Sequence, residues 1–408
     1  MTGISNNKAV GAWFTGLFFP VIGFIYALFH PTSKNYKVLF VLFFTFLGIA
    51  FTFTEASSGD VVRYVMNFYA ARTMRGIGFF EYFRLRPEKQ QIDFYSSFML
   101  WFVSRFTGNY RLFLGIHALV YSLFFVANIQ YVVRRIQTNS YSVFLLILLV
   151  FAPKMMLLTH RWWTALQVFL FGALPVIFEK KYRKLLWCFA AAFVFHFSFL
   201  YPLILLLLSL ILPKKSLWPY LLLFVVTSGM NSFDFSFITP YIDFLFSDAV
   251  ADRTTSYMNS EIGERNLFSQ SGKIVMNIAN VVLSLAVYFS NRENIKNNKV
   301  LRSLYVVTLL IGSFAMLTSL TQWGWRYLDL SYMLFVIFYL AYLSEANNYK
   351  KNIQVFQLVS PLFLYFIFFQ IRGAFSIIGP FQFFLGNYIT TWFLHDKTSM
   401  LDFIKQIF

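Results

Sequence analysis

The sequence predicts an all-α polytopic integral membrane protein, a bundle of about 11–14 transmembrane or re-entrant segments with short amphipathic helices on its outer face. Composition is the first reason: of the 408 residues, 58% are hydrophobic and 12% are charged, and the mean hydropathy is +0.62. Such a chain has too little polar surface to cover a soluble core. The second reason is that long apolar runs recur between short polar loops, as spanning helices of about 20 residues require. We therefore expect a single transmembrane domain over residues 1–408.

The apolar runs predict the spanning helices in chain order. The first run has neither a basic segment before it nor a small-residue cleavage site, so it is predicted to be a retained helix and not a signal peptide. From Met400 the tail alternates apolar and charged residues with a helical period, which predicts a helix along the membrane surface. The predicted spans are residues 10–29, 38–54, 112–133, 141–158, 162–178, 217–230, 273–290, 303–320, 328–345, 353–371 and 375–394.

Two apolar segments do not fit a single spanning helix. Residues 92–106 are short and carry Arg105. Residues 185–212 are too long for one span, and Pro202 within "FHFSFLYP" is predicted to break their helix. Both segments are therefore predicted to be broken or re-entrant. Cys188 is the single cysteine of the chain, which excludes a disulfide within it.

Loop charges predict the orientation. Thirteen lysines and five arginines, together eighteen of the chain's 34 Lys and Arg, lie in or beside "HPTSKNYK", "VRRIQTNS", "EKKYRK", "PKKS", "NRENIKNNK", "NNYKK" and "HDKTSM". The positive-inside rule makes these loops cytoplasmic. It places the N-terminus outside, together with an outer segment at 55–91 and an outer loop at 231–272. In the outer segment, the spacing of Val62, Val65, Met66 and Tyr69 predicts an amphipathic helix.

In this topology the lysines lie mainly on the cytoplasmic side and most of the arginines on the outer side. A guanidinium donates two parallel hydrogen bonds to phosphate or carboxylate, so clustered outer arginines predict a cavity for an anionic ligand. The alternative is that they pair with the outer acids Asp234, Asp243, Asp248, Asp252, Glu261 and Glu264, or reach lipid headgroups. That alternative is weaker for Arg161, Arg326 and Arg372, which sit where apolar runs meet and need buried partners. The outer arginines are Arg63, Arg72, Arg75, Arg84, Arg86, Arg105, Arg111, Arg161, Arg253, Arg265, Arg326 and Arg372.

Four short motifs resemble those of EpsG/Wzy-type polysaccharide polymerases. "SSGDVVRYVMNFY", with Asp60, Arg63 and Tyr64, is similar to the G-x-D-x-x-x-Y motif of the family's first outer loop, with Val61 where a tyrosine is commoner. "LLTHRWWTALQVFLFGAL" resembles an arginine-led helix start, "AAAFVFHFSFLYPLIL" an A-x-x-x-H-x-S stretch, and "GWRYLDLSYML" a late arginine-aromatic motif. The motifs keep the family's order between about residues 51 and 334.

The resemblance implies a membrane glycosyltransferase of the bacterial inner membrane, with its active site facing the periplasm or cell exterior. Such an enzyme transfers a growing glycan from undecaprenyl pyrophosphate to the non-reducing-end sugar of a new lipid-linked repeat unit. The implied partners are undecaprenyl-pyrophosphate-linked oligosaccharide, membrane lipids and a chain-length regulator. Fixed guanidiniums suit this reaction, because the leaving pyrophosphate gains negative charge.

Site roles follow as hypotheses. Asp60 or His196 is the candidate to accept the acceptor hydroxyl's proton, while Asp60 has the rival role of orienting Arg63. For His196 the alternative is a packed histidine. The predicted catalytic residues are Asp60, His196, Arg161 and Arg326, and the predicted substrate-binding residues are Arg63, Tyr64, Arg372, Tyr327, His160 and Trp325. The aromatic members could stack on sugar rings or populate an interfacial belt.

Other functions are less favoured by the sequence. The outer acids form no D-x-D pair and have no histidine near them, and no phosphate-binding loop of the G-x-x-x-x-G-K-[ST] type occurs, so neither a metal nor a nucleotide cofactor is expected. The basic residues are too scattered for nucleic acid. A flippase or exporter of lipid-linked oligosaccharide stays open, although it would favour two halves of related hydropathy. An acyltransferase is not excluded either.

Overall fold

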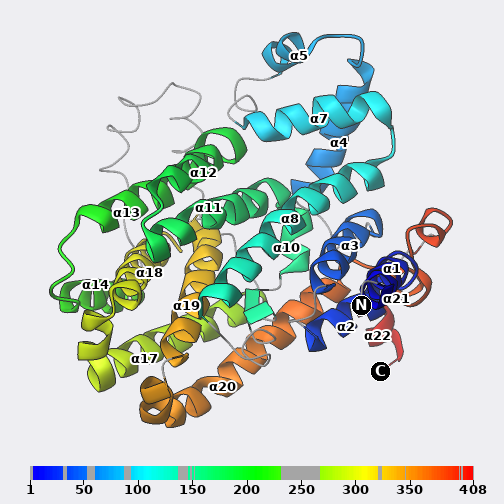
Figure 1. The fold of residues 1–408 in the computed structure, drawn as a ribbon. Helices are drawn as coiled ribbons and strands as arrows, with labels where there is room; N and C mark the ends of the chain where they lie inside the picture. The colour runs from blue at the N-terminus through cyan, green and yellow to red at the C-terminus, as the bar shows by residue number, and fades with distance from the viewer. Residues whose placement is uncertain are drawn as a thin grey trace.

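The structure is a computed structural model of the chain, and it is helical throughout the part it describes. Described are residues 3–30, 35–52, 60–86, 93–136, 146–147, 149–150, 152–230, 267–319, 324–344, 346–394, 396 and 398–407. Over these residues extended pairing is limited to an isolated bridge between Phe51 and Ile378. The predicted all-α fold is confirmed (Figure 1).

The helices follow one another with short connections in most places. Their bounds are α1 Gly3–Phe18, α2 Pro20–Phe29, α3 Tyr36–Ile49, α4 Asp60–Thr73, α5 Phe79–Leu85, α7 Phe94–Phe106, α8 Tyr110–Ile136, α10 Pro153–Leu158, α11 His160–Glu179, α12 Leu185–Ala190, α13 Leu200–Ile211, α14 Trp218–Ser228, α17 Leu267–Asn297, α18 Lys299–Thr318, α19 Tyr327–Leu343, α20 Ala346–Phe375, α21 Pro380–Leu385 and α22 Met400–Ile407.

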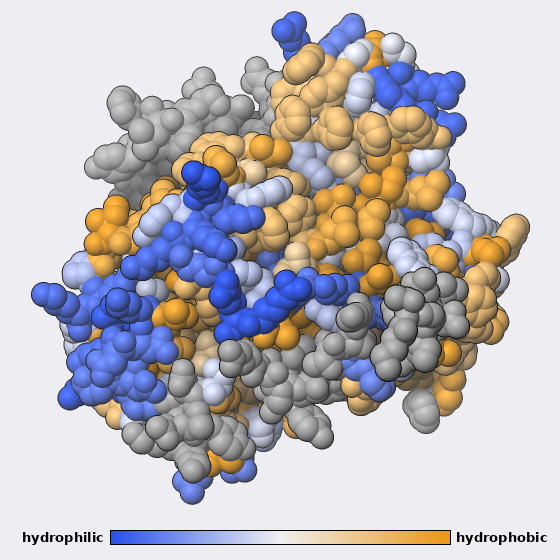
Figure 2. All heavy atoms as spheres, in the orientation of Figure 1, coloured by the Kyte–Doolittle hydropathy of each residue, from blue (hydrophilic) through white to orange (hydrophobic). Residues whose placement is uncertain are grey.

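Six helices of the described chain are long and apolar enough to cross a membrane, namely α8, α11, α17, α18, α19 and α20. Four further apolar segments are shorter, at Pro20–Phe29, Tyr36–Ile49, Phe197–Ile211 and Trp218–Ser228. Hydrophobic side chains cover much of the visible surface in Figure 2, as expected of a surface in contact with lipid. The chain is therefore a multi-pass membrane protein.

Helices α11 and α19 form the centre of the bundle. In each, 83% of the most apolar stretch is buried, compared with 17% in α20. A helix that is hydrophobic all round is suited to burial on every side. Accordingly, α11 packs against α8, α12 and α18, and α19 packs against α18 and α20. These two central helices both begin beside an arginine, Arg161 or Arg326, that the sequence singled out.

Helices α3 and α8 approach closely through glycine. A Cβ atom added to Gly48 would lie 2.7 Å from the carbonyl oxygen of Leu114 and 2.9 Å from the Cα of Gly115. Small residues allow such close approach between membrane helices, where packing takes the place of the hydrophobic effect.

Replacement of Gly48 by alanine is expected to lower the free energy of unfolding by about 1–3 kcal/mol, because backbone atoms of α8 must move to admit the methyl group. Unfolding in mixed detergent micelles measures the loss. Gly11→Ala is the matched control, since no atom lies within 4 Å of the added carbon there. Equal stability of the Gly48 variant and the control would contradict close packing of α3 on α8.

Two predicted spans are corrected by the structure. Residues 10–29 form two helices, because Pro20 cannot continue the turn before it and instead starts α2. Residues 375–394 are not a spanning helix: α20 ends at Phe375, and only α21 and a short 3₁₀ turn at Thr390–Trp392 follow. Glycines at 379 and 386 bound α21 in extended backbone conformations, which stops the helix at both ends.

The predicted break in residues 185–212 is present but lies earlier than expected. After α12, a π-helical turn spans Ala191–Phe195, His196 is extended (φ −159°, ψ 115°), and a 3₁₀ turn at Phe197–Phe199 leads into α13. Pro202 is in the first turn of α13, where its missing N–H costs nothing. Assigning the break to Pro202 was therefore wrong. Residues 92–106 contain one continuous helix, α7, whose 13 residues reach only about 20 Å, short of a bilayer core.

The helix predicted within residues 55–91 exists as α4, and one of its faces is buried in the protein. Val61, Tyr64, Val65 and Phe68 are buried, whereas Val62, Met66 and Tyr69 are exposed. The buried set has the i, i+3, i+4, i+7 spacing of one helix face. Val62, Met66 and Tyr69, from the predicted set, form a second apolar face of the same helix. Of the predicted loop at 231–272, residues 231–266 lie outside the described chain, as do residues 141–145 of the predicted span 141–158; the predicted tail helix is α22.

Candidate active site

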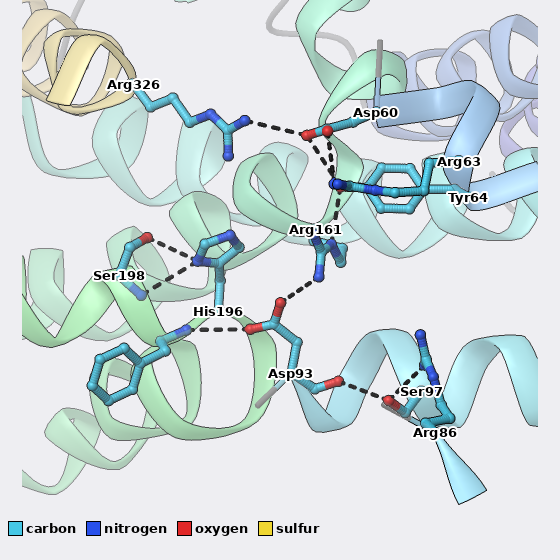
Figure 3. A network of polar contacts seen from close by, with 11 residues as sticks. Asp60, Arg63, Tyr64, Arg86, Asp93, Ser97, Arg161, His196, Ser198 and Arg326 are labelled. Atoms are coloured by element: carbon cyan, nitrogen blue, oxygen red, sulfur yellow. Dashed lines mark hydrogen bonds and ion pairs between the residues drawn. The ribbon is translucent and has the colours of Figure 1, made fainter. Parts of the chain in front are cut away.

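Polar side chains from five parts of the chain meet at one end of the central helices (Figure 3). They come from the start of α4, the residue before α7, the start of α11, the break at His196, and the 3₁₀ turn Gly324–Arg326 before α19. Five residues predicted from sequence lie in this network: Asp60, Tyr64, Arg161, Arg326 and Arg63.

The Asp60 carboxylate receives donors from two separate elements. Its Oδ1 accepts from Nη2 of Arg63 at 2.7 Å, one helical turn along α4. Its Oδ2 accepts from Nη2 of Arg326 at 3.2 Å and from the Tyr64 hydroxyl at 3.4 Å. Asp60 begins α4, where a negative charge also interacts favourably with the helix dipole. One carboxylate thus holds two guanidiniums that are 263 positions apart in the chain.

Arg161 is buried and has a buried acidic partner. Its Nη1 forms an ion pair with Oδ2 of Asp93, and its Nε donates to the Tyr64 hydroxyl at 2.9 Å. The side chains of Arg161 and Asp93 are 9% and 2% exposed, so each charge depends on the other for stability in an apolar protein. Tyr64 links the two halves of the network, because its hydroxyl accepts from Arg161 and donates to Asp60.

Sequence reasoning missed Asp93. It occupies the N-cap position of α7, where an aspartate ordinarily accepts hydrogen bonds from its own helix, yet its side chain makes no cap bond. The carboxylate instead forms the ion pair with Arg161. It also accepts a hydrogen bond from the backbone N–H of Phe197 at 3.5 Å. An acid before an apolar helix looks like an ordinary cap. One feature of the sequence did point to such an acid: Arg161 lies in an apolar region, where an arginine needs a buried partner of opposite charge.

Arg86 adds a second cation near Asp93. Its Nη1 donates to the Ser97 hydroxyl at 2.8 Å, and that hydroxyl donates to the Asp93 carbonyl at 3.3 Å. Burial is the main cause that lowers the pKa of Arg86 from its ordinary value, and the positive charge of Arg161 lowers it further. Tyr82 and Asp93 act in the opposite direction and raise this pKa. The opposing influences of Arg161 and Asp93 place Arg86 within the field of the buried pair.

His196 sits at the break before α13 and is held by Ser198. Its Nδ1 accepts from the Ser198 backbone N–H at 3.3 Å and lies 2.8 Å from the Ser198 hydroxyl. Because a backbone N–H can only donate, Nδ1 carries no proton, and the neutral ring is protonated on Nε2. In this tautomer Nε2 is a hydrogen-bond donor. The arrangement therefore favours donation from His196 to an anion over acceptance of a proton.

The turn that carries Arg326 is anchored on both sides. The Tyr327 hydroxyl donates to the Ser198 carbonyl at 2.7 Å, which fixes the start of α19 against the break. On the other side, Lys273 Nζ donates to the Trp325 carbonyl at 2.7 Å and to Asp329 Oδ2 at 3.2 Å. The Lys273 ammonium also lies 4.7 Å from the centre of the Trp325 ring. Arg326 is thus presented from a supported turn.

Three predicted site residues occupy other positions. The His160 ring packs between Tyr64, at a centroid distance of 4.2 Å, and His117, at 3.9 Å, and is buried behind the network. Trp325 faces Lys273. Arg372 lies near the end of α20, beside Lys154 of α10: a Cβ added to the adjacent Gly373 would be 3.7 Å from the Lys154 side chain. The structure thus places these three side chains beside Tyr64 and His117, Lys273, and Lys154 respectively.

The network carries a surplus of positive charge. Within the described chain its charged members are four arginines, Arg63, Arg86, Arg161 and Arg326, and two aspartates, Asp60 and Asp93. Arg63 and Arg326 are accessible, with side chains 52% and 24% exposed. Such an arrangement can bind an anion at Arg63 and Arg326 while Arg161 stays buried. No cluster of three metal-binding side chains occurs among the described residues.

Comparison with known proteins gives one match. The model of the EpsG family matches residues 35–382, which include every residue of the network. No curated protein and no solved structure matches the chain.

Proposed function

We propose that this chain, which belongs to the EpsG family, is a polysaccharide polymerase that joins lipid-linked repeat units. The donor is the growing glycan on undecaprenyl pyrophosphate, and the acceptor is the non-reducing-end sugar of a new undecaprenyl-pyrophosphate-linked unit. The reaction takes place at the outer face of the bacterial inner membrane, on the side where the positive-inside rule places the start of α4.

The reaction forms one bond and breaks one. The acceptor hydroxyl oxygen attacks C1 of the reducing-end sugar of the growing glycan, and the C1–oxygen bond to pyrophosphate breaks. The hydroxyl proton passes to a base, and undecaprenyl pyrophosphate leaves with the bonding electrons. Negative charge therefore builds on the pyrophosphate oxygens in the transition state, where fixed cations lower the barrier most.

The observation that supports this proposal best is the convergence of Arg63 and Arg326 on Asp60. Both guanidiniums are accessible and are aimed at one point from independent elements, so a pyrophosphate arriving there meets two positioned forks. We assign Arg63 and Arg326 to the pyrophosphate. Arg161 is then a positioning residue, because it acts on the site through the hydroxyl of Tyr64. His196 is the candidate donor to a phosphate oxygen.

Asp60 is the preferred proton acceptor. It is the accessible carboxylate of the network, with a side chain 22% exposed, and it adjoins both proposed pyrophosphate ligands. A base there lies beside the bond that breaks, as general base catalysis requires. Direct pyrophosphate binding by Arg161 or Arg372, and sugar stacking by Tyr64, Tyr327 or Trp325, remain predictions without a supporting contact.

Complementation tests the proposed function. The chain is expressed in a strain that lacks its own repeat-unit polymerase, and the glycans are separated on gels. We expect a ladder of repeat lengths. Single repeats that reach the cell surface without a ladder would overturn polymerisation. Restored export in a flippase-deficient strain, without a ladder in the polymerase-deficient one, would favour the flippase alternative.

Arg326→Lys is expected to keep complementation but reduce the amount of polymer about tenfold. Lysine retains the charge and loses the planar fork that reaches both Asp60 and a pyrophosphate oxygen. Densitometry of the ladder measures the change. Arg75→Lys, at an exposed arginine beyond α4, is the matched control and should give a normal ladder. A normal ladder from both variants would remove Arg326 from the site.

A further inference from the structure

A basic pocket lies at the far end of the bundle from the candidate active site. It is formed where α11 and α13 end and α18 begins, and its volume is about 300 Å³. Helix α11 connects the two places, with Arg161 at its start and Val176, Ile177 and Lys180 of the pocket at its end. Its 20 residues span about 30 Å, so the pocket is separate from the network around Asp60.

Among the described residues, four cations and no acidic side chain line this pocket. They are Lys180 after α11, Lys214 after α13, and Lys299 and Arg302 in the first turn of α18. Lys214 Nζ is 3.5 Å from the Ser303 hydroxyl, and Arg302 Nη1 donates to the Lys296 carbonyl at 3.1 Å. The Nε of Arg302 is buried and has no hydrogen-bond partner among the described atoms. A buried guanidinium N–H of this kind can donate to a group bound in the pocket.

The surroundings of Lys214 favour the binding of an anion in this pocket. Burial lowers its pKa from the ordinary lysine value, and repulsion from Arg302 and Lys180 lowers it further. An anion between these groups would offset both effects, since it supplies the countercharge that the pocket lacks.

Aliphatic side chains form another part of the pocket wall. Leu210, Leu212 and Val307 line it, and the neighbouring Ile211 is 81% exposed on the outer surface of α13. A soluble anion gains nothing from contact with an apolar wall. A lipid, in contrast, can place its phosphate among the cations and its chains along α13. Basic pockets between membrane helices on the cytoplasmic side suit anionic headgroups. The loops that bear these four cations are those that the positive-inside rule makes cytoplasmic.

We propose that this pocket binds the phosphate headgroup of an anionic phospholipid from the cytoplasmic leaflet. Lys180, Lys214 and Arg302 surround the phosphate, and the lipid chains follow the exposed side of α13. The inference does not depend on the proposed polymerase reaction, because no residue of the candidate active site takes part.

Native mass spectrometry of the purified protein tests the proposal with phosphatidylglycerol, phosphatidylcholine and inorganic phosphate as separate probes. We expect tight binding of phosphatidylglycerol, and Lys214→Gln should weaken the tightest site about fivefold, the worth of one cation near an anionic lipid. Arg302→Gln should do at least as much. Arg183→Gln is the matched control, because Arg183 is exposed in the same loop as Lys180 and does not line the pocket.

Three outcomes would overturn the assignment. Equal affinity for phosphatidylcholine would show that charge is not recognised. Inorganic phosphate that competes as well as the lipid would identify a free-anion site. Unchanged phosphatidylglycerol binding in Lys214→Gln would place the lipid elsewhere. The Arg302→Gln variant loses the hydrogen bond from Arg302 to the Lys296 carbonyl. If that loss prevents its folding, Lys214→Gln still tests the proposal.

Discussion

Asp60→Asn is expected to reduce polymer formation by about 10²–10⁴-fold, the range for loss of a general base. Asparagine is the same size and still accepts a hydrogen bond, but it cannot take a proton. The change also removes the negative charge between Arg63 and Arg326, so the surplus positive charge at the site rises. Binding of the lipid-linked donor should therefore be as tight as before, or tighter, while turnover falls.

The measurement is chain extension by purified protein in lipid nanodiscs, with lipid-linked repeat units from the host strain, alongside a binding assay for the same donor. His196→Gln is the comparison, because glutamine keeps a side-chain donor where the structure favours donation from His196. A fall of less than about tenfold for Asp60→Asn, together with a larger fall for His196→Gln, would transfer the role of base to His196. Asp60 would then be an orienting residue for the two arginines.

Asp93→Asn is expected to lower the free energy of unfolding by about 3–5 kcal/mol, because it leaves the buried charge of Arg161 without a countercharge. It also weakens the acceptor of the Phe197 N–H at the break before α13. Polymer yield should fall with the amount of folded protein. Unfolding in mixed micelles, monitored by tryptophan fluorescence, measures the stability.

Two further variants test whether the loss of stability in Asp93→Asn comes from the unpaired buried charge of Arg161. Asp402→Asn removes an exposed ion pair with Lys405 and should cost less than about 1 kcal/mol. The double variant Asp93→Asn/Arg161→Gln should be more stable than Asp93→Asn alone, because no unpaired charge stays buried. A double variant that is no more stable would contradict the interpretation of Arg161 and Asp93 as a mutually dependent pair.

Most of the fold could be predicted because the length of each apolar run determines whether it forms a spanning helix. The predicted spans for α8, α11, α18 and α19 end within a few residues of the observed helices, since each is one apolar run between polar loops. The errors lie where backbone chemistry overrides hydropathy. Pro20 divides one apolar run, the bend of another falls at His196 and not at Pro202, and glycines on either side of α21 stop it short.

The candidate site could be predicted in part. Asp60, Arg63 and Tyr64 share one helical turn, so their proximity is local, and the need of Arg161 and Arg326 for partners was visible in their apolar surroundings. Which partners they take is a property of distant packing. Asp93 resembled a helix cap, and Arg372 proved to lie beside Lys154. Sequence spacing cannot distinguish such cases, because it contains no distances between helices.

The break at His196 makes distant parts of the chain depend on one another for folding. Its exposed backbone groups are satisfied from both directions along the chain: Asp93 precedes it and accepts the Phe197 N–H, while Tyr327 follows it and donates to the Ser198 carbonyl. During synthesis Asp93 and Arg161 enter the membrane early, but Tyr327 belongs to the last quarter of the 408 residues. A chain without Tyr327 lacks the donor to the Ser198 carbonyl at this break. Docking of α19 is thus the step that satisfies that carbonyl and brings Arg326 to Asp60.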